Sequence, residues 1–86
     1  MEIGFARGGS HLAFWKGHVV LSDPDRNRLV ILDPTTGDLQ FVGAAGTLPG
    51  QFRNPVGLAV GPGDKLYVLD SDNNRVQVFN SDLLTK

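Results

Sequence analysis

The fold is decided by residues 50–60, GQFRNPVGLAV, together with the two runs that follow, LYVLD at 66–70 and NNRVQVF at 73–79. Each run is rich in β-branched or aromatic residues and is bounded by Gly, Pro, Asp or Asn, a pattern typical of short strands joined by turns. In the last run Val76 and Val78 alternate with polar residues, which predicts a strand with one covered face. The middle run is apolar at successive positions, so we expect this strand to be covered from both sides.

The rest of the 86-residue chain has the same organisation. Apolar runs lie at 18–22, 28–32 and 39–42. The segment DPTTGD at 33–38 predicts a hairpin turn, because Pro fixes one backbone dihedral and Gly can adopt a left-handed conformation. No window repeats apolar residues at helical spacing for long enough to form a helix. The chain is therefore predicted to be all-β.

The same strand unit occurs twice. A shift of 47 residues aligns 19–32 with 66–79, and four of the fourteen pairs are identical: Asp23/Asp70, Asp25/Asp72, Asn27/Asn74 and Arg28/Arg75. Six more pairs keep an apolar residue, and a shift of 46 aligns 12–14 with 58–60. The change of shift falls in a hairpin loop, where an insertion is tolerated best. A repeated four-stranded antiparallel unit of about 40–45 residues indicates a β-propeller blade.

The second copy closely resembles the NHL repeat, whose pattern runs from glycine and phenylalanine through Pro-x-Gly to a strand, an aspartate and Asn-Arg-Val. The first copy is degenerate, since Trp15-Lys16 replaces the Pro-x-Gly turn and Arg26 replaces an Asn. The resemblance implies an all-β fold of four-stranded propeller blades, two per chain, which close into a six-bladed ring by homo-oligomerisation. We divide the chain into an N-terminal strand (1–9), a first blade (10–46) and a second blade with an incomplete outer strand (47–86).

Two blades leave two apolar flanks in water, so we expect the chain to bind itself. Three copies would give six blades, two copies four and four copies eight; the homotrimer is favoured. We further expect residues 2–6 to complete the second blade of a neighbouring copy, so that deleting residues 1–7 abolishes the oligomer.

The residues of the repeat are expected to be structural. Asp and Asn ordinarily bond their own turn amides, and the resemblance implies that each Arg reaches a neighbouring blade and that Phe52 plugs the space between blades. These structural residues are Phe52, Pro55, Gly57, Asp70, Asn74 and Arg75 in the second copy, with Asp23, Asn27 and Arg28 in the first. No catalytic residue, cofactor or metal site is predicted; Asp23, Asp70 and His18 are the only candidates for metal ligands.

The composition of the chain argues against several classes of function. The net charge of −1 argues against nucleic acid, which requires clustered basic residues, and no apolar run approaches the roughly 18 residues of a membrane span. The absence of Cys excludes disulfides, and without a signal peptide the location defaults to the cytoplasm.

Three functions remain in competition. The leading hypothesis is a non-enzymatic interaction module that acts as a binding scaffold for a protein or peptide. The alternatives are a metal-dependent propeller enzyme, similar to lyases or lactonases, and an engineered or excised propeller fragment without its own function.

Overall fold

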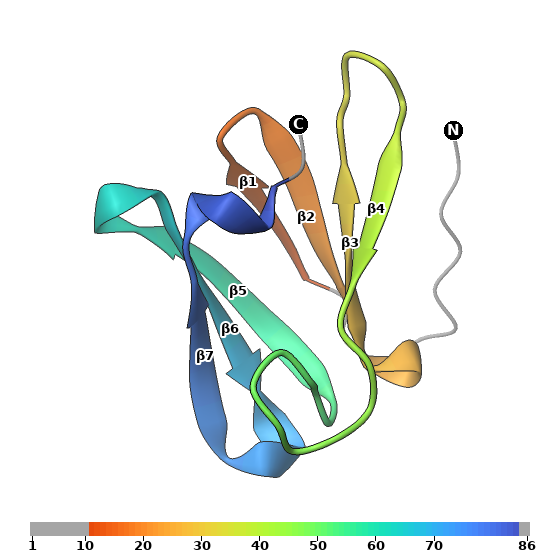
Figure 1. The fold of residues 1–86 in the computed structure, drawn as a ribbon, viewed down its shortest axis with the longest axis vertical. Coiled ribbons are helices and arrows are strands. Elements are labelled where there is room, and N and C mark those ends of the chain that lie inside the picture. The colour runs from red at the N-terminus through yellow and green to blue at the C-terminus, as the bar shows by residue number, and fades with distance from the viewer. Residues whose placement is uncertain (1–10, 85–86) are drawn as a thin grey trace.

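The structure, a computed structural model, describes residues 11–84 and consists of two antiparallel sheets (Figure 1). The first sheet has the order β1-β2-β3-β4 and the second the order β5-β6-β7. No α-helix occurs within residues 11–84, and no helix there could cross a membrane. The all-β prediction is confirmed. The strands are β1 (Leu12–Trp15), β2 (His18–Asp23), β3 (Arg28–Leu32), β4 (Leu39–Val42), β5 (Pro55–Gly61), β6 (Lys65–Asp70) and β7 (Arg75–Phe79).

Equivalent turns of the two sheets have the same backbone conformation. One 3-10 turn, Pro24–Arg26, links β2 to β3, and another, Ser71–Asn73, links β6 to β7. Each is followed by an asparagine with a φ of 52°, Asn27 in one sheet and Asn74 in the other. Among residues with a β-carbon, Asn tolerates this left-handed conformation best. The identical asparagines of the repeat therefore close identical turns.

The second sheet has three strands within residues 11–84, because the chain enters a 3-10 turn at Ser81–Leu83 after β7 instead of pairing again. Another short 3-10 segment, Pro62–Asp64, links β5 to β6. The strand expected to be exchanged between copies, residues 2–6, lies outside the described residues, so the exchange stays a prediction.

The core lies between the two sheets. Trp15, Phe52, Leu29 and Leu66 are all fully buried there. Trp15, which the comparison with the repeat assigned to a turn, instead ends β1 and lies in this core. The turn starts one residue later, at Lys16 and Gly17, so the indole remains on the inner face of the strand.

Hydrogen bonds between the sheets fix how they are aligned. The Trp15 indole N–H donates to the Asp64 carbonyl oxygen over 2.7 Å, and the Leu58 amide donates to Nδ1 of His11 over 3.0 Å. The Ser22 hydroxyl donates to the Val56 carbonyl over 3.2 Å. These bonds join β1, the residue before it and β2 to β5 and its hairpin, so the two sheets meet mainly through these strands.

Two leucines test the importance of this core. Leu29 is fully buried between the sheets, whereas Leu48 lies in the β4–β5 connection with 63% of its surface exposed. Leu29→Ala is expected to lower the free energy of unfolding by about 2–5 kcal/mol, because it leaves a cavity. Leu48→Ala should change it by no more than about 0.5 kcal/mol. Urea denaturation measures both, and equal effects would contradict the assigned core.

Candidate interaction surface

The strand register assigns alternate residues to the inner and outer faces of each sheet. In the first sheet Ala13, Val20 and Ile31 are aligned across the strands and face the second sheet, because all three contribute to the core. The residues of opposite parity form the first-sheet outer face. These are Leu12 and Phe14 of β1, Val19 and Leu21 of β2, Val30 and Leu32 of β3, and Leu39 and Phe41 of β4.

The first-sheet outer face is apolar at these eight positions, and the Asp23–Arg28 ion pair lies at its end. Val30 is fully buried, but several of the other residues are exposed. Phe14 exposes 73% of its surface and Leu12 exposes 49%. Phe41, which is 54% exposed, stacks beneath the Arg28 guanidinium at 4.2 Å. A contiguous apolar surface of this kind marks an interaction site in a folded protein.

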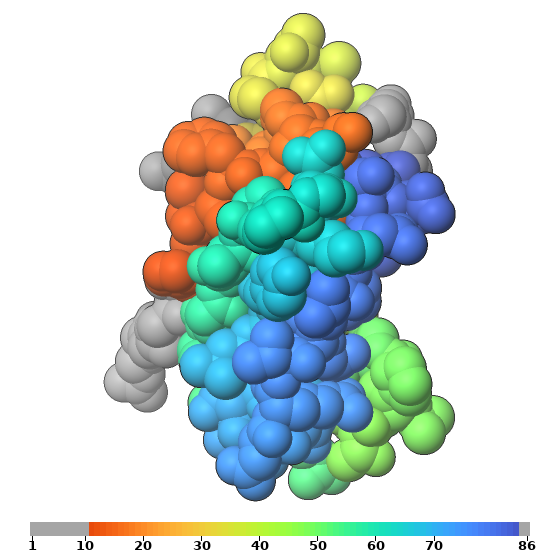
Figure 2. All heavy atoms as spheres, turned by 90° about the vertical axis from the view of Figure 1, so that its left-hand side faces the viewer, coloured from red at the N-terminus to blue at the C-terminus, as the bar shows by residue number. Residues whose placement is uncertain are grey.

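The second sheet also has an apolar outer face, which is the side seen in Figure 2. Tyr67 is half-buried, and Leu69 and Val76 expose 45% and 55% of their surfaces. We define the second-sheet outer face as Gly57, Ala59, Tyr67, Leu69, Val76 and Val78.

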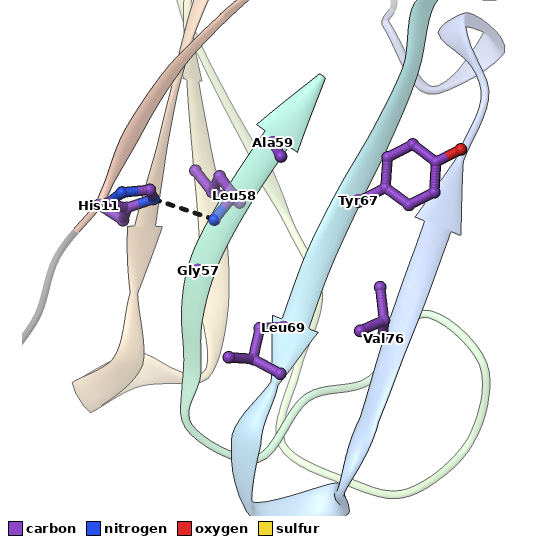
Figure 3. Close-up of a pocket in the computed structure, with 7 residues that line it drawn as sticks. All are labelled: His11, Gly57, Leu58, Ala59, Tyr67, Leu69 and Val76. Carbon is purple, nitrogen blue, oxygen red and sulfur yellow. Dashed lines mark hydrogen bonds between the residues drawn. The ribbon is translucent and has the colours of Figure 1, made fainter. Parts of the chain in front are cut away.

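A shallow pocket of about 320 Å³ lies on this face (Figure 3). The side chains of Tyr67, Leu69 and Val76 border it, with His11 at its edge. The strand LYVLD was expected to be covered on both sides; β6 is covered on its inner face, but the exposed Leu69 shows that the outer face is open.

Asp70 is the centre of a polar network at the base of the second sheet. One carboxylate oxygen, Oδ1, accepts the Arg53 amide N–H over 2.7 Å. The other oxygen, Oδ2, accepts bonds from Asn73, Arg75 and Gln77 over 2.8–3.1 Å. Burial raises the pKa of this carboxyl group, but the four hydrogen bonds outweigh burial and hold the pKa below its ordinary value.

Arg75 ties this network to the segment between the sheets. Its Nε donates to Asp70, and its other nitrogens donate to the carbonyl oxygens of Thr47, Leu48 and Gln51. The arginine was expected to reach the neighbouring blade, but it bonds the carboxylate of its own sheet and the backbone of the connecting segment. Within that segment Phe52 is buried, and its ring centroid lies 6.0 Å from that of Phe79.

The corresponding site in the first sheet is less complete. Asp23 Oδ2 is bonded by Arg28 Nε over 3.0 Å and Arg26 over 3.4 Å. Asp23 Oδ1 is buried and has no hydrogen-bond partner among residues 11–84. The sequence explains why Oδ2 has fewer donors: Arg26 replaces Asn73 and Val30 replaces Gln77, so the two amide groups that donate to Asp70 Oδ2 have no counterpart in the first sheet.

The remaining residues named from the sequence, Pro55 and His18, lie apart from one another. Pro55 is buried at the start of β5, where a bulge separates it from Gly57. The His18 Nδ1 lies 2.9 Å from the Lys16 carbonyl oxygen. Within residues 11–84, no three His, Asp or Glu side chains lie close enough together to share a metal ion. The structure therefore does not bring His18 together with Asp23 and Asp70.

The sequence indicated the outer faces only in general terms, as apolar flanks. Phe14, Leu69 and the pocket could not be recognised from it as parts of these faces. A signal was present for Phe14: in β1 it alternates with Ala13 and Trp15, whose side chains pack inward.

The comparisons identify the class of unit that the second sheet forms. Residues 52–79 match the family model of the NHL repeat, and this segment contains all of β5, β6 and β7. The match confirms the resemblance to the NHL repeat. No curated protein matches the chain.

The Asp70 network should make stability depend on pH. Because its folded-state pKa is lowered, the stabilisation is present above the unfolded-state pKa of about 3.9 and is lost as pH falls through the folded-state value. Asp70→Asn is expected to cost roughly 3 kcal/mol at pH 7, since the substitution weakens the bonds from Arg75 and from three other donors.

Urea denaturation at pH 7 and at pH 2–3 measures this cost, which should shrink at the acidic pH. Asp72→Asn is the matched control, because Asp72 is exposed and carries the same charge. An equal loss in both variants, or a loss at Asp70 that does not depend on pH, would contradict the assignment.

Proposed function

We propose that the chain supplies two blades of an NHL-type β-propeller that acts as a non-enzymatic binding scaffold for a protein or peptide. The observation that carries the proposal is the pair of packed antiparallel sheets with an apolar face left open on each side. The NHL repeat match over residues 52–79 supports the blade assignment for the second sheet.

Assembly follows from the open faces. Propellers close with four to eight blades, and two sheets do not form a ring. Three copies of the 86-residue chain would supply six blades, which is the number that we propose. Closure would bury both outer faces, leaving the loops at the two ends of the sheets free to bind a partner.

The mass of the purified chain in solution tests this proposal. Light scattering coupled to size-exclusion chromatography should give the mass of three chains, and small-angle scattering should fit a flat ring. A chain that remains monomeric at micromolar concentration, with a cooperative melting transition, would contradict the proposal.

A further inference from the structure

The two sheets of one chain pack through different faces of the same repeat. The 47-residue shift relates the inward residues of the first sheet, Val20, Leu29 and Ile31, to Tyr67, Val76 and Val78 on the second-sheet outer face. The same shift relates Leu66, Val68 and Phe79, which face inward in the second sheet, to Val19, Leu21 and Leu32 on the first-sheet outer face. The contact inside the chain thus joins one type of face to the other.

The outer faces of the two sheets are of these same two types, and they lie on opposite sides of the molecule. Leu29 and Ile31 are buried in the contact within the chain, whereas their counterparts Val76 and Val78 are 55% and 51% exposed. Leu58 is only 7% exposed, whereas its counterpart Leu12 is 49% exposed. Positions that are buried in one repeat of the chain are therefore exposed at the equivalent positions of the other repeat.

We propose that the first-sheet outer face of one copy of this chain packs against the second-sheet outer face of another copy, head to tail. This inference rests on the proposed function, and it names the surfaces that meet. The contact repeats the one already present between the two sheets of each chain. Because the two faces differ, the contact is heterologous, and successive contacts of this type can close a ring.

Side-chain sizes on the two faces favour this arrangement. Within the chain β5 contacts β1 and β2, so β1 of the next copy would contact β5 and β6. Gly57 stands in the second sheet where the first has His11, which leaves the pocket beside Ala59 and Tyr67 open (Figure 3). The incoming β1 carries Phe14 where the second sheet has the smaller Val60. The larger side chain thus meets the more open face.

The charges also favour a second copy as the occupant. The charged residues at the end of the first-sheet outer face, Asp23 and Arg28, are paired with each other over 3.0 Å. The second-sheet outer face is bordered by one charged residue, Lys65, at the start of β6. Two such faces can bury each other without leaving an unpaired charge, whereas a strongly charged partner would lose its hydration without compensation.

Cysteine cross-linking tests the orientation, since the natural sequence contains no cysteine. Leu12→Cys and Ala59→Cys variants are prepared separately, because both positions are exposed and lie on opposite faces. After mild oxidation, a mixture of the two should give a disulfide between Leu12→Cys and Ala59→Cys chains. Each variant alone should give at least tenfold less cross-linked product.

The outcomes separate this inference from the proposed function. Self-cross-linking of a single variant in place of the mixed product would show face-to-face pairing and overturn the inference, even if the chain is oligomeric. A mass of three chains without the mixed product would overturn the inference alone. A mass of one chain would overturn both proposals.

Two lysine substitutions provide a second test that does not depend on disulfide geometry. Val76→Lys places a charge on the second-sheet outer face, and Phe14→Lys does so on the first. Because both residues are exposed in the chain, each variant should keep its far-ultraviolet circular dichroism while its mass falls from three chains to one.

The matched control is Leu48→Lys, since Leu48 is exposed but lies on neither face. This variant should keep the mass of the unmodified chain. If Val76→Lys and Phe14→Lys also keep that mass, the proposed contact is wrong.

Discussion

The structure depends on one constraint: a sheet with two apolar faces needs a cover on each of them. Within the chain this need is met once, where Trp15, Leu29 and Leu66 meet between the two sheets. Hydrophobic burial contributes about 25 cal/mol for each Å² removed from water, so the faces that remain open favour a further contact of the same kind. The assembly proposed above follows from this imbalance.

Much of the fold could be predicted because the same pattern of residues occurs twice in the sequence. The identical asparagines at 27 and 74 indicated equivalent turns, and both adopt the same left-handed conformation. Trp15 could not be placed from sequence, because whether a strand extends one residue further into a hairpin depends on packing against the other sheet. Likewise, the contact of His11 with Leu58 joins residues 47 positions apart, and no local pattern reports it.

The hydrogen bonds of Asp23 and Asp70 could be predicted only in part from the sequence of the repeat. Asp23 and Asp70 occupy equivalent positions, yet in the described part of the chain only Asp70 has donors for both of its oxygens. The loss of two donors to Oδ2 was visible in the sequence, as Arg26 and Val30 in place of Asn73 and Gln77. Its consequence was not, because it depends on which side chains converge on one carboxylate. A degenerate repeat can keep its backbone conformation while it loses some of the hydrogen bonds to its buried aspartate.

The most direct test of the central claim is an isotope-filtered nuclear Overhauser experiment on a mixture of labelled and unlabelled chains. Tyr67 is the only tyrosine in the sequence, so its ring protons are unambiguous reporters of the second-sheet outer face. Our account predicts intermolecular contacts from the Tyr67 ring to Leu12 or Phe14. Contacts from Tyr67 to Tyr67 of another chain, or no intermolecular contacts at all, would contradict it.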